Sequence, residues 1–228
     1  MKISGLAKVT LTDFPGVVSC IVFTQGCNFK CPFCHNSDLI PIENGTVEEQ
    51  EVFDYLKQRK GLIDGLVITG GEPLIQKDII DFIKKIKDLD IKIKLDTNGT
   101  NYEVLKKIVD NNLVDYIAMD IKHDEKNYSI ISGTANHSFD NIKKSISLIE
   151  KSNIDYEFRT TIVKEFHDIN TIKNIIKLID KKSKYFIQNF EDNERVLQKG
   201  LHGFNKEELK GIDKELKKIH KETLIRGI

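Results

Sequence analysis

Short apolar runs alternate with longer amphipathic stretches along most of the chain. Six runs rich in β-branched and other apolar residues predict buried strands, at positions 19–24, 65–69, 91–96, 114–120, 156–163 and 185–190. Lysine-rich stretches with helical apolar spacing follow them and predict helices at 47–59, 79–87, 102–109, 140–149, 169–180 and 206–220. Because strands and helices alternate, the pattern indicates a parallel sheet with right-handed crossovers.

The composition indicates one neutral globular domain. A chain of 228 residues can bury a sizeable core, so we expect a single domain over 1–228. The 35 Lys and Arg residues balance 35 Asp and Glu residues, which leaves no overall field to attract nucleic acid or an anionic membrane. No apolar run has the length of a membrane span, and the N-terminus lacks a signal-peptide pattern. We therefore expect a cytoplasmic protein that binds neither nucleic acid nor membranes.

Three cysteines lie in one short loop. The string GCNFKCPFCHN places Cys27, Cys31 and Cys34 directly after the first apolar run, in a CxxxCxxC pattern. Three thiolates on a [4Fe-4S] cluster leave one iron without a protein ligand, open to a small molecule. A structural zinc held by these cysteines and His35 is the alternative, although zinc sites usually present their ligands as two separated pairs.

Paired glycines follow the second apolar run. Gly70 and Gly71 precede Glu72 at the end of the sheet where the cysteine loop is expected. Glycines at a strand end allow a ligand to approach the backbone, because no Cβ lies in the way. A tight turn without a ligand is the alternative interpretation.

Carboxylates close the next two apolar runs. Asp96 lies in the string LDTNG, and Asp120 lies in AMDIK. An unpaired carboxylate would be costly to bury there, so each is expected to have a partner. Capping of the following helix is the alternative role, since Asp and Asn are common at such joints.

The signal is weaker in the second half of the chain. Arg159 falls in a polar-apolar alternation that directs it either into the sheet's inner side or onto an exposed strand face. The histidines His123, His137, His167, His202 and His220 show no mutual ligand spacing, so we expect them at the surface.

The cysteine loop, with an aromatic residue before its last cysteine, resembles the signature of radical S-adenosylmethionine (SAM) enzymes. The longer string GCNFKCPFCHN, together with LTDFPG, LDTNG and AMDIK, is similar to the activating enzymes of glycyl radical enzymes. Among these it is most similar to the activating proteins of anaerobic ribonucleoside-triphosphate reductase. The resemblance covers nearly the whole chain and implies an α/β fold, a partial (β/α)6 barrel with a parallel sheet and outer helices. Periodicity alone leaves a flat doubly wound sheet open.

The resemblance also implies a set of site residues. Cys27, Cys31 and Cys34 would bind one [4Fe-4S] cluster and so serve the catalysis. The residues expected to bind SAM or its surroundings are Phe33, His35, Gly70, Gly71, Glu72, Asp96, Thr97, Asn98, Asp120, Lys122 and Arg159.

Some of these residues receive finer roles from the resemblance. The turn at Gly70, Gly71 and Glu72 would receive the amino group of SAM. Asp96, Thr97 and Asp120 would hold a monovalent cation against the SAM carboxylate, and oxygen ligands suit such a hard cation. The resemblance also implies that Lys122 lies near the nucleotide.

The implied activity is the reductive cleavage of SAM to a 5′-deoxyadenosyl radical, which would generate a glycyl radical on anaerobic ribonucleoside-triphosphate reductase. A low-potential donor such as flavodoxin or ferredoxin would supply the electron. The chain has four cysteines, and no group of them beyond the loop could bind a second cluster. The alternatives are activation of pyruvate formate-lyase or another glycyl radical enzyme, a radical SAM enzyme with a small-molecule substrate, and a zinc-stabilised binding module.

Overall fold

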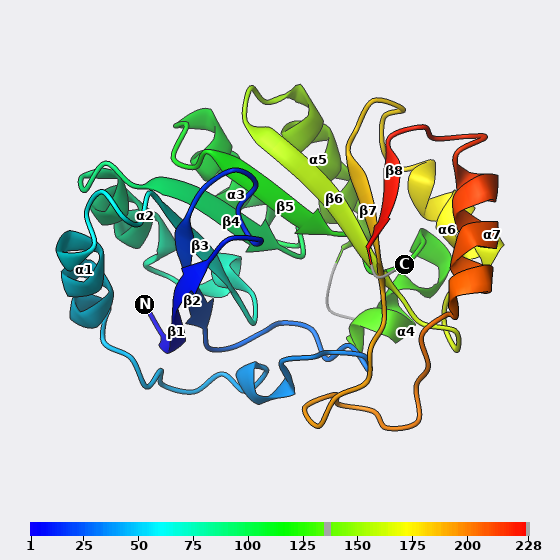
Figure 1. The fold of residues 1–228 in the computed structure, drawn as a ribbon, viewed down its shortest axis with the longest axis horizontal. Helices are drawn as coiled ribbons and strands as arrows, with labels where there is room; N and C mark the ends of the chain where they lie inside the picture. Colours follow the sequence, from blue (N-terminus) through cyan, green and yellow to red (C-terminus); the bar gives the residue numbers. More distant parts are fainter. Residues whose placement is uncertain (135–137, 227–228) are drawn as a thin grey trace.

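An eight-stranded sheet is the centre of the fold in the computed structural model, which describes residues 1–134 and 138–226. Its strands are β1 (Ile3–Thr10), β2 (Ser19–Thr24), β3 (Gly65–Gly70), β4 (Lys92–Thr97), β5 (Tyr116–Asp120), β6 (Asp155–Ile162), β7 (Tyr185–Asn189) and β8 (Thr223–Arg226). They follow one another in the sheet in chain order, and every pair is parallel except β1 with β2. The sheet curves, and β1 and β8 form its opposite edges (Figure 1).

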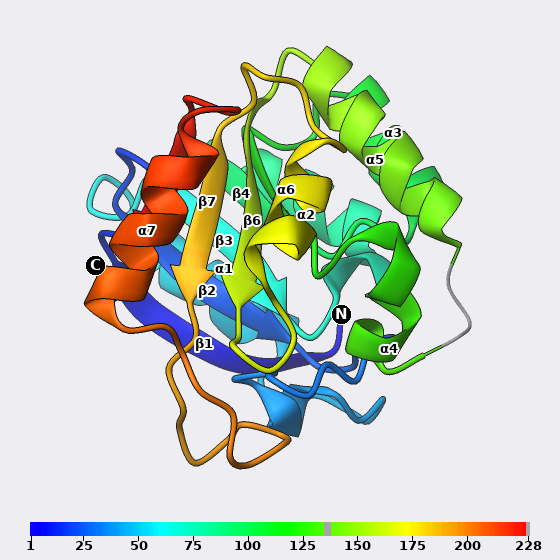
Figure 2. The ribbon, with the colours of Figure 1, turned by 90° about the vertical axis from the view of Figure 1, so that its right-hand side faces the viewer.

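Helices connect the parallel strands and cover the outer face of the sheet. They are α1 (Glu49–Gln58), α2 (Ile79–Lys87), α3 (Tyr102–Asp110), α4 (Tyr128–Ser132), α5 (Phe139–Lys151), α6 (Ile169–Ile176) and α7 (Lys206–Leu216). In α2, the buried residues Ile79, Phe82, Ile83 and Ile86 share one helical face, which packs into the main core. Figure 2 shows α6 and α7 in front of β6 and β7. In the described part of the chain, no helix combines the length and the apolar character needed to cross a bilayer.

The predicted α/β architecture is confirmed. The six predicted strands are β2 to β7, each followed by a helix, as a partial (β/α)6 barrel requires. Two further strands, β1 and β8, were not predicted. β1 is a half-exposed edge strand with two register irregularities, so its hydrophobic pattern is weak, and β8 has four residues.

The inner face of the sheet changes character along the strands. Near the strand starts, Phe14 packs with Ile21, Val67, Tyr116 and Ala118 in a small apolar cluster. Because residues two apart on a strand share a face, Asp120 lies on the same inward face as Tyr116 and Ala118, nearer the carboxyl end of β5. Asp96 and Arg159 pair with Ala118 and Asp120 on the neighbouring strands, so charged residues occupy this part of the inner face. The apolar cluster closes one end of the barrel and leaves the polar end open.

Two long segments meet at the open end. One is the cysteine loop, which follows β2, and the other is the 190–205 segment, which follows β7. The backbone N–H of Gln198 donates to the carbonyl of Pro32 at 2.9 Å, and the Ser37 hydroxyl donates to the carbonyl of Arg195. Figure 2 shows both segments beneath the strand ends.

Candidate active site

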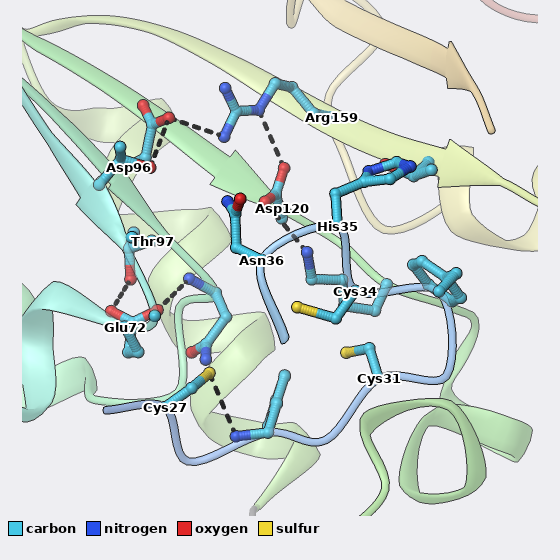
Figure 3. Close-up of a pocket in the computed structure, with 18 of the residues that line it drawn as sticks. Cys27, Cys31, Cys34, His35, Asn36, Glu72, Asp96, Thr97, Asp120 and Arg159 are labelled. Atoms are coloured by element: carbon cyan, nitrogen blue, oxygen red, sulfur yellow. Dashed lines mark hydrogen bonds and ion pairs between the residues drawn. The ribbon is translucent and has the colours of Figure 1, made fainter. Parts of the chain in front are cut away.

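A pocket opens at the carboxyl ends of β3 to β7, under the cysteine loop (Figure 3). All of the site residues that the sequence singled out line it: Cys27, Cys31, Phe33, Cys34, His35, Gly70, Gly71, Glu72, Asp96, Thr97, Asn98, Asp120, Lys122 and Arg159. They come from separate parts of the chain and meet because parallel strands end at one edge of the sheet.

The cysteine loop is anchored on both sides. Its Lys30 N–H donates to the carbonyl of Ser132 at 2.8 Å, and its Pro32 carbonyl accepts from Gln198. Figure 3 shows the three cysteine side chains around one space at the mouth of the pocket. The loop therefore holds the thiols in position through its backbone, without using the thiols as the anchors.

Burial determines the protonation state of two of these thiols. It raises the pKa of Cys27 to about 12 and that of Cys31 to about 11. Both are therefore neutral near pH 7 in the metal-free protein, and binding iron as thiolates must release their protons. In residues 1–134 and 138–226, no three His, Cys, Asp or Glu side chains are grouped to hold a single metal ion. A cubane cluster spreads its three cysteine ligands over three irons, and three thiols around one space fit that donor set.

Gly71 is where the backbone of the β3 turn meets the cysteine loop. A Cβ at this position would lie 2.0 Å from the carbonyl oxygen of Gly26, the residue before Cys27. The N–H of Glu72 donates to the same carbonyl at 2.9 Å. The close approach that the paired glycines predicted is thus made by the protein's own backbone, and Gly71 couples the turn to the loop.

The Glu72 carboxylate fastens this turn to the end of β4. It accepts from Thr97 Oγ1 at 2.8 Å, from the N–H of Asn98 at 2.7 Å and from the N–H of Leu74 at 3.0 Å. Burial raises the pKa of Glu72 to about 7, although these donors act in the opposite direction.

Charged residues at the ends of β4, β5 and β6 form an ion-paired network (Figure 3). Arg159 bridges two strands, with Nε 2.9 Å from Asp120 Oδ1 and Nη2 3.2 Å from Asp96 Oδ2. Lys122 Nζ lies 3.0 Å from Asp120 Oδ2. Burial alone would raise the pKa of Asp120, but the charges of Arg159 and Lys122 outweigh it and hold that pKa well below its usual range. The prediction that these carboxylates have partners is confirmed.

Lys94 extends the network below the pocket and was not predicted from the sequence. Its side chain is 2% exposed, its ammonium is ion-paired with Asp96 Oδ1, and Nζ lies 6.0 Å from the centre of the Tyr116 ring. The signal was present, since Lys94 and Asp96 are two residues apart in a strand and must share a face.

Phe33 and His35 line the pocket and also pack against residues outside the cysteine loop. Phe33 is 3% exposed and packs against Phe166 and His167, which gives the cysteine loop an apolar backing. The His35 ring stacks on Phe190, and its Nε2 lies 2.8 Å from a backbone carbonyl oxygen of the 190–205 segment. This segment therefore holds the ring that the zinc alternative would need as its fourth ligand.

The expectation of surface histidines is wrong for three residues. His123, His167 and His220 are each 1% exposed, and each places Nε2 3.0–3.1 Å from a backbone carbonyl oxygen. These partners are distant in sequence, so spacing between histidines could not show them. His202 is exposed, as expected, and His137 lies outside the described residues.

Five further residues line the pocket: Phe29, Asn36, Thr69, Thr161 and Gln188. Thr161 follows Arg159 on the inward side of β6, and Gln188 is the pairing partner of Thr161 on β7. Asn36 had no signal beyond its place after the last cysteine and His35.

Comparison with known proteins identifies the family to which this chain belongs. The model of the radical SAM superfamily matches residues 21–179, which include the cysteine loop and the ends of β2 to β6. The chain belongs to the radical SAM superfamily. Membership implies a [4Fe-4S] cluster and SAM, and an enzyme of the radical SAM type.

Individual relatives identify a subgroup within the superfamily. A protein of Methanocaldococcus jannaschii named as a glycyl-radical enzyme activating enzyme is 33% identical over 235 residues, covering 99% of this chain and 96% of the relative. The pyruvate formate-lyase-activating enzyme of Clostridium pasteurianum is 30% identical over 227 residues, covering 96% of this chain and 90% of that enzyme. Within the superfamily, this chain is one of the glycyl-radical enzyme activating enzymes.

The fold has solved counterparts. SuiB of Streptococcus suis, crystallised with its precursor peptide SuiA, superposes with a TM-score of 0.70 at 17% identity. The superposition covers 91% of this chain and 48% of SuiB, so the chain spans about half the length of that protein. At this identity the likeness shows the fold alone.

Proposed function

We propose that this chain cleaves SAM reductively and generates a glycyl radical on anaerobic ribonucleoside-triphosphate reductase. The observation that carries the proposal is the pocket, which the three-cysteine loop and a charged network at the strand ends line together. A [4Fe-4S] cluster would supply one electron to SAM, whose cleavage would give methionine and the 5′-deoxyadenosyl radical that takes a hydrogen atom from glycine.

The residues that would do this work lie on two sides of the pocket. We call the cysteine loop the loop wall, and the carboxyl ends of β3 to β6 the strand wall. Cys27, Cys31 and Cys34 would hold the cluster, backed by buried Phe33. Gly70 and Gly71 shape the wall against which the amino group of SAM would lie. Cationic groups at Lys122 and Arg159 would attract its carboxylate, because both lie in the pocket with little exposure to competing water.

A protein substrate is supported by the relatives, which are named as activating enzymes of glycyl radical enzymes. The reductase is proposed from the motifs of the chain, including LTDFPG and GCNFKCPFCHN. Pyruvate formate-lyase is the second candidate, since a relative that matches nearly the whole chain is named as its activating enzyme. We expect the protein to be cytoplasmic and to receive its electron from flavodoxin or ferredoxin.

The partner can be tested by anaerobic mixing of the iron-loaded protein, SAM and a strong one-electron reductant with each candidate enzyme from the same cell. A doublet electron paramagnetic resonance signal in the reductase would support the proposal. The same signal in pyruvate formate-lyase alone would favour the second candidate. SAM cleavage with neither partner responding would favour a small-molecule substrate, and stoichiometric zinc with no iron would favour a zinc-stabilised module.

A monovalent cation bound by Asp96, Thr97 and Asp120 remains a prediction of the sequence. The structure gives each of these side chains a partner within the protein. Thr97 Oγ1 donates to Glu72, and both carboxylates are ion-paired with cationic side chains.

A further inference from the structure

The carboxylates at the ends of β4 and β5 are surrounded by the chain's own cations. Asp96 Oδ1 contacts Lys94 Nζ, and Asp96 Oδ2 contacts Arg159 Nη2 at 3.2 Å. Asp120 Oδ1 contacts Arg159 Nε at 2.9 Å, and Asp120 Oδ2 contacts Lys122 Nζ at 3.0 Å. Each of the four carboxylate oxygens therefore faces a charged donor.

Lys94 is the unusual member of this group. Its ammonium is buried beneath the pocket, where an unpaired charge would be very costly, and Asp96 is the ion-pair partner that the structure records for it. Its position on β4 fixes it to the same inward face as Asp96, so it reaches that carboxylate from below. Arg159 reaches the same carboxylate from the neighbouring side of the sheet.

These contacts do not fit a site for a monovalent metal ion. Such a site needs oxygen ligands with net negative charge directed at the ion. Here three cationic side chains, Lys94, Lys122 and Arg159, face the two carboxylates. Arg159 also lies 3.9 Å from the buried carboxylate of Glu157, which is paired with Arg226 at 3.1 Å. The four cationic side chains thus exceed the three carboxylates by one positive charge. An added metal cation would be repelled, whereas a carboxylate of a ligand would be attracted.

We propose that Lys94 and Arg159 supply at Asp96 and Asp120 the positive charge that a bound monovalent cation would otherwise provide. The SAM carboxylate then binds at the excess positive charge of this network, and SAM affinity does not depend on sodium or potassium. The inference rests on the proposed function, because it assumes that SAM occupies this pocket.

The test is the SAM dissociation constant of the iron-loaded protein, measured anaerobically by calorimetry in potassium chloride, sodium chloride or choline chloride at equal ionic strength. The inference expects equal affinity in the three salts. Tightening by about tenfold or more in potassium or sodium would overturn it. Absence of SAM binding in every salt would overturn the proposed function and this inference together, whereas cation-dependent binding overturns the inference alone.

Lys94→Met supplies the second test, with Lys92→Met as its matched control. Lys92 lies on the same strand but is exposed, so its replacement removes an equal charge without touching the network. We expect Lys94→Met to bind SAM about tenfold more weakly in choline chloride and to recover affinity in potassium chloride. Lys92→Met should behave as the wild type in both salts.

Unchanged SAM affinity of Lys94→Met in choline chloride would overturn the inference. The iron content and thermal unfolding of the variant show whether it is folded. The comparison of salts on the wild-type protein decides the question without any variant.

Discussion

The cysteine loop and the ends of β4 to β6 line the same pocket, but they depend on different interactions. At the strand ends, the side chains of Asp96, Asp120 and Arg159 form ion pairs with one another or with lysines. In the loop, burial keeps the thiols of Cys27 and Cys31 neutral, and the loop is positioned by backbone contacts. The strand wall is complete within the protein, whereas the loop wall acquires its charge when a metal binds.

The largest effect should follow from removing one thiol. Cys31→Ala should lower the iron content from about four per chain to none, because a cuboidal cluster loses one of its three protein ligands. Iron analysis after anaerobic reconstitution measures this. Cys20→Ala is the control, since Cys20 is buried in β2 outside the pocket and its loss should cost about 1 kcal/mol of stability with iron retained. Normal iron content in Cys31→Ala would show that the loop does not bind the cluster as described.

A change at Gly71 should damage both walls together. Gly71→Ala places a Cβ 2.0 Å from the carbonyl oxygen of Gly26, so the turn and the cysteine loop must move apart. We expect a loss of about 4 kcal/mol in the free energy of unfolding, together with reduced iron binding. Gly211→Ala in α7 is the matched control, because a Cβ there meets nothing within 4 Å and should stabilise the protein by about 1 kcal/mol. Equal stability of Gly71→Ala and wild type would show that Gly71 does not couple the two walls.

Glu72 should make the stability of the metal-free protein depend on pH. Its pKa is raised from 4.5 to about 7 in the folded state, so its contribution is fully present below pH 4.5 and is lost as the pH rises through 7. The free energy of unfolding should therefore fall by about 3 kcal/mol over this range.

Glu72→Gln removes the titrating group, so the difference between wild type and variant isolates this contribution from the histidines. Denaturant unfolding of both proteins at pH 5, 6, 7 and 8 measures it, with the pH values set around the pKa of about 7. Parallel pH profiles would mean that Glu72 is ionised throughout.

A change confined to the strand wall should have the smallest effect. Arg159→Gln should weaken SAM binding by about tenfold or more and leave the iron content unchanged, because Arg159 contacts the carboxylates and not the thiols. Calorimetric SAM titration and iron analysis measure the two quantities. Arg195→Gln, an exposed arginine of the 190–205 segment, is the control. Loss of iron in Arg159→Gln would show that the two walls are not separable.

The sequence predicted the features that are local or follow from strand direction. The three cysteines were found because they lie within eight positions of one another. Asp96 and Asp120 were found because each ends an apolar run, and parallel strands bring such ends together. The same reasoning predicted strands β2 to β7 and their order of connection.

Features that depend on distant backbone were missed. The need for glycine at position 71 comes from the carbonyl of Gly26, which chain folding alone brings near. The buried histidines are satisfied by carbonyl groups that lie up to 45 residues away, as for His167 and Lys122. The sequence analysis made no prediction for Lys94, whose place beside Asp96 follows from strand alternation but whose contact with the ring of Tyr116 depends on the neighbouring strand.

The central claim is that the 5′-deoxyadenosyl radical removes a hydrogen atom from a glycine of a partner enzyme. Deuterium transfer tests this claim directly. The protein is mixed anaerobically with SAM, reductant and a reductase whose glycines carry deuterium at Cα, and the 5′-deoxyadenosine is analysed by mass spectrometry. The account predicts that 5′-deoxyadenosine gains deuterium while a glycyl radical appears on the reductase. Cleavage of SAM that yields 5′-deoxyadenosine without deuterium, in the presence of both labelled candidate partners, would contradict it.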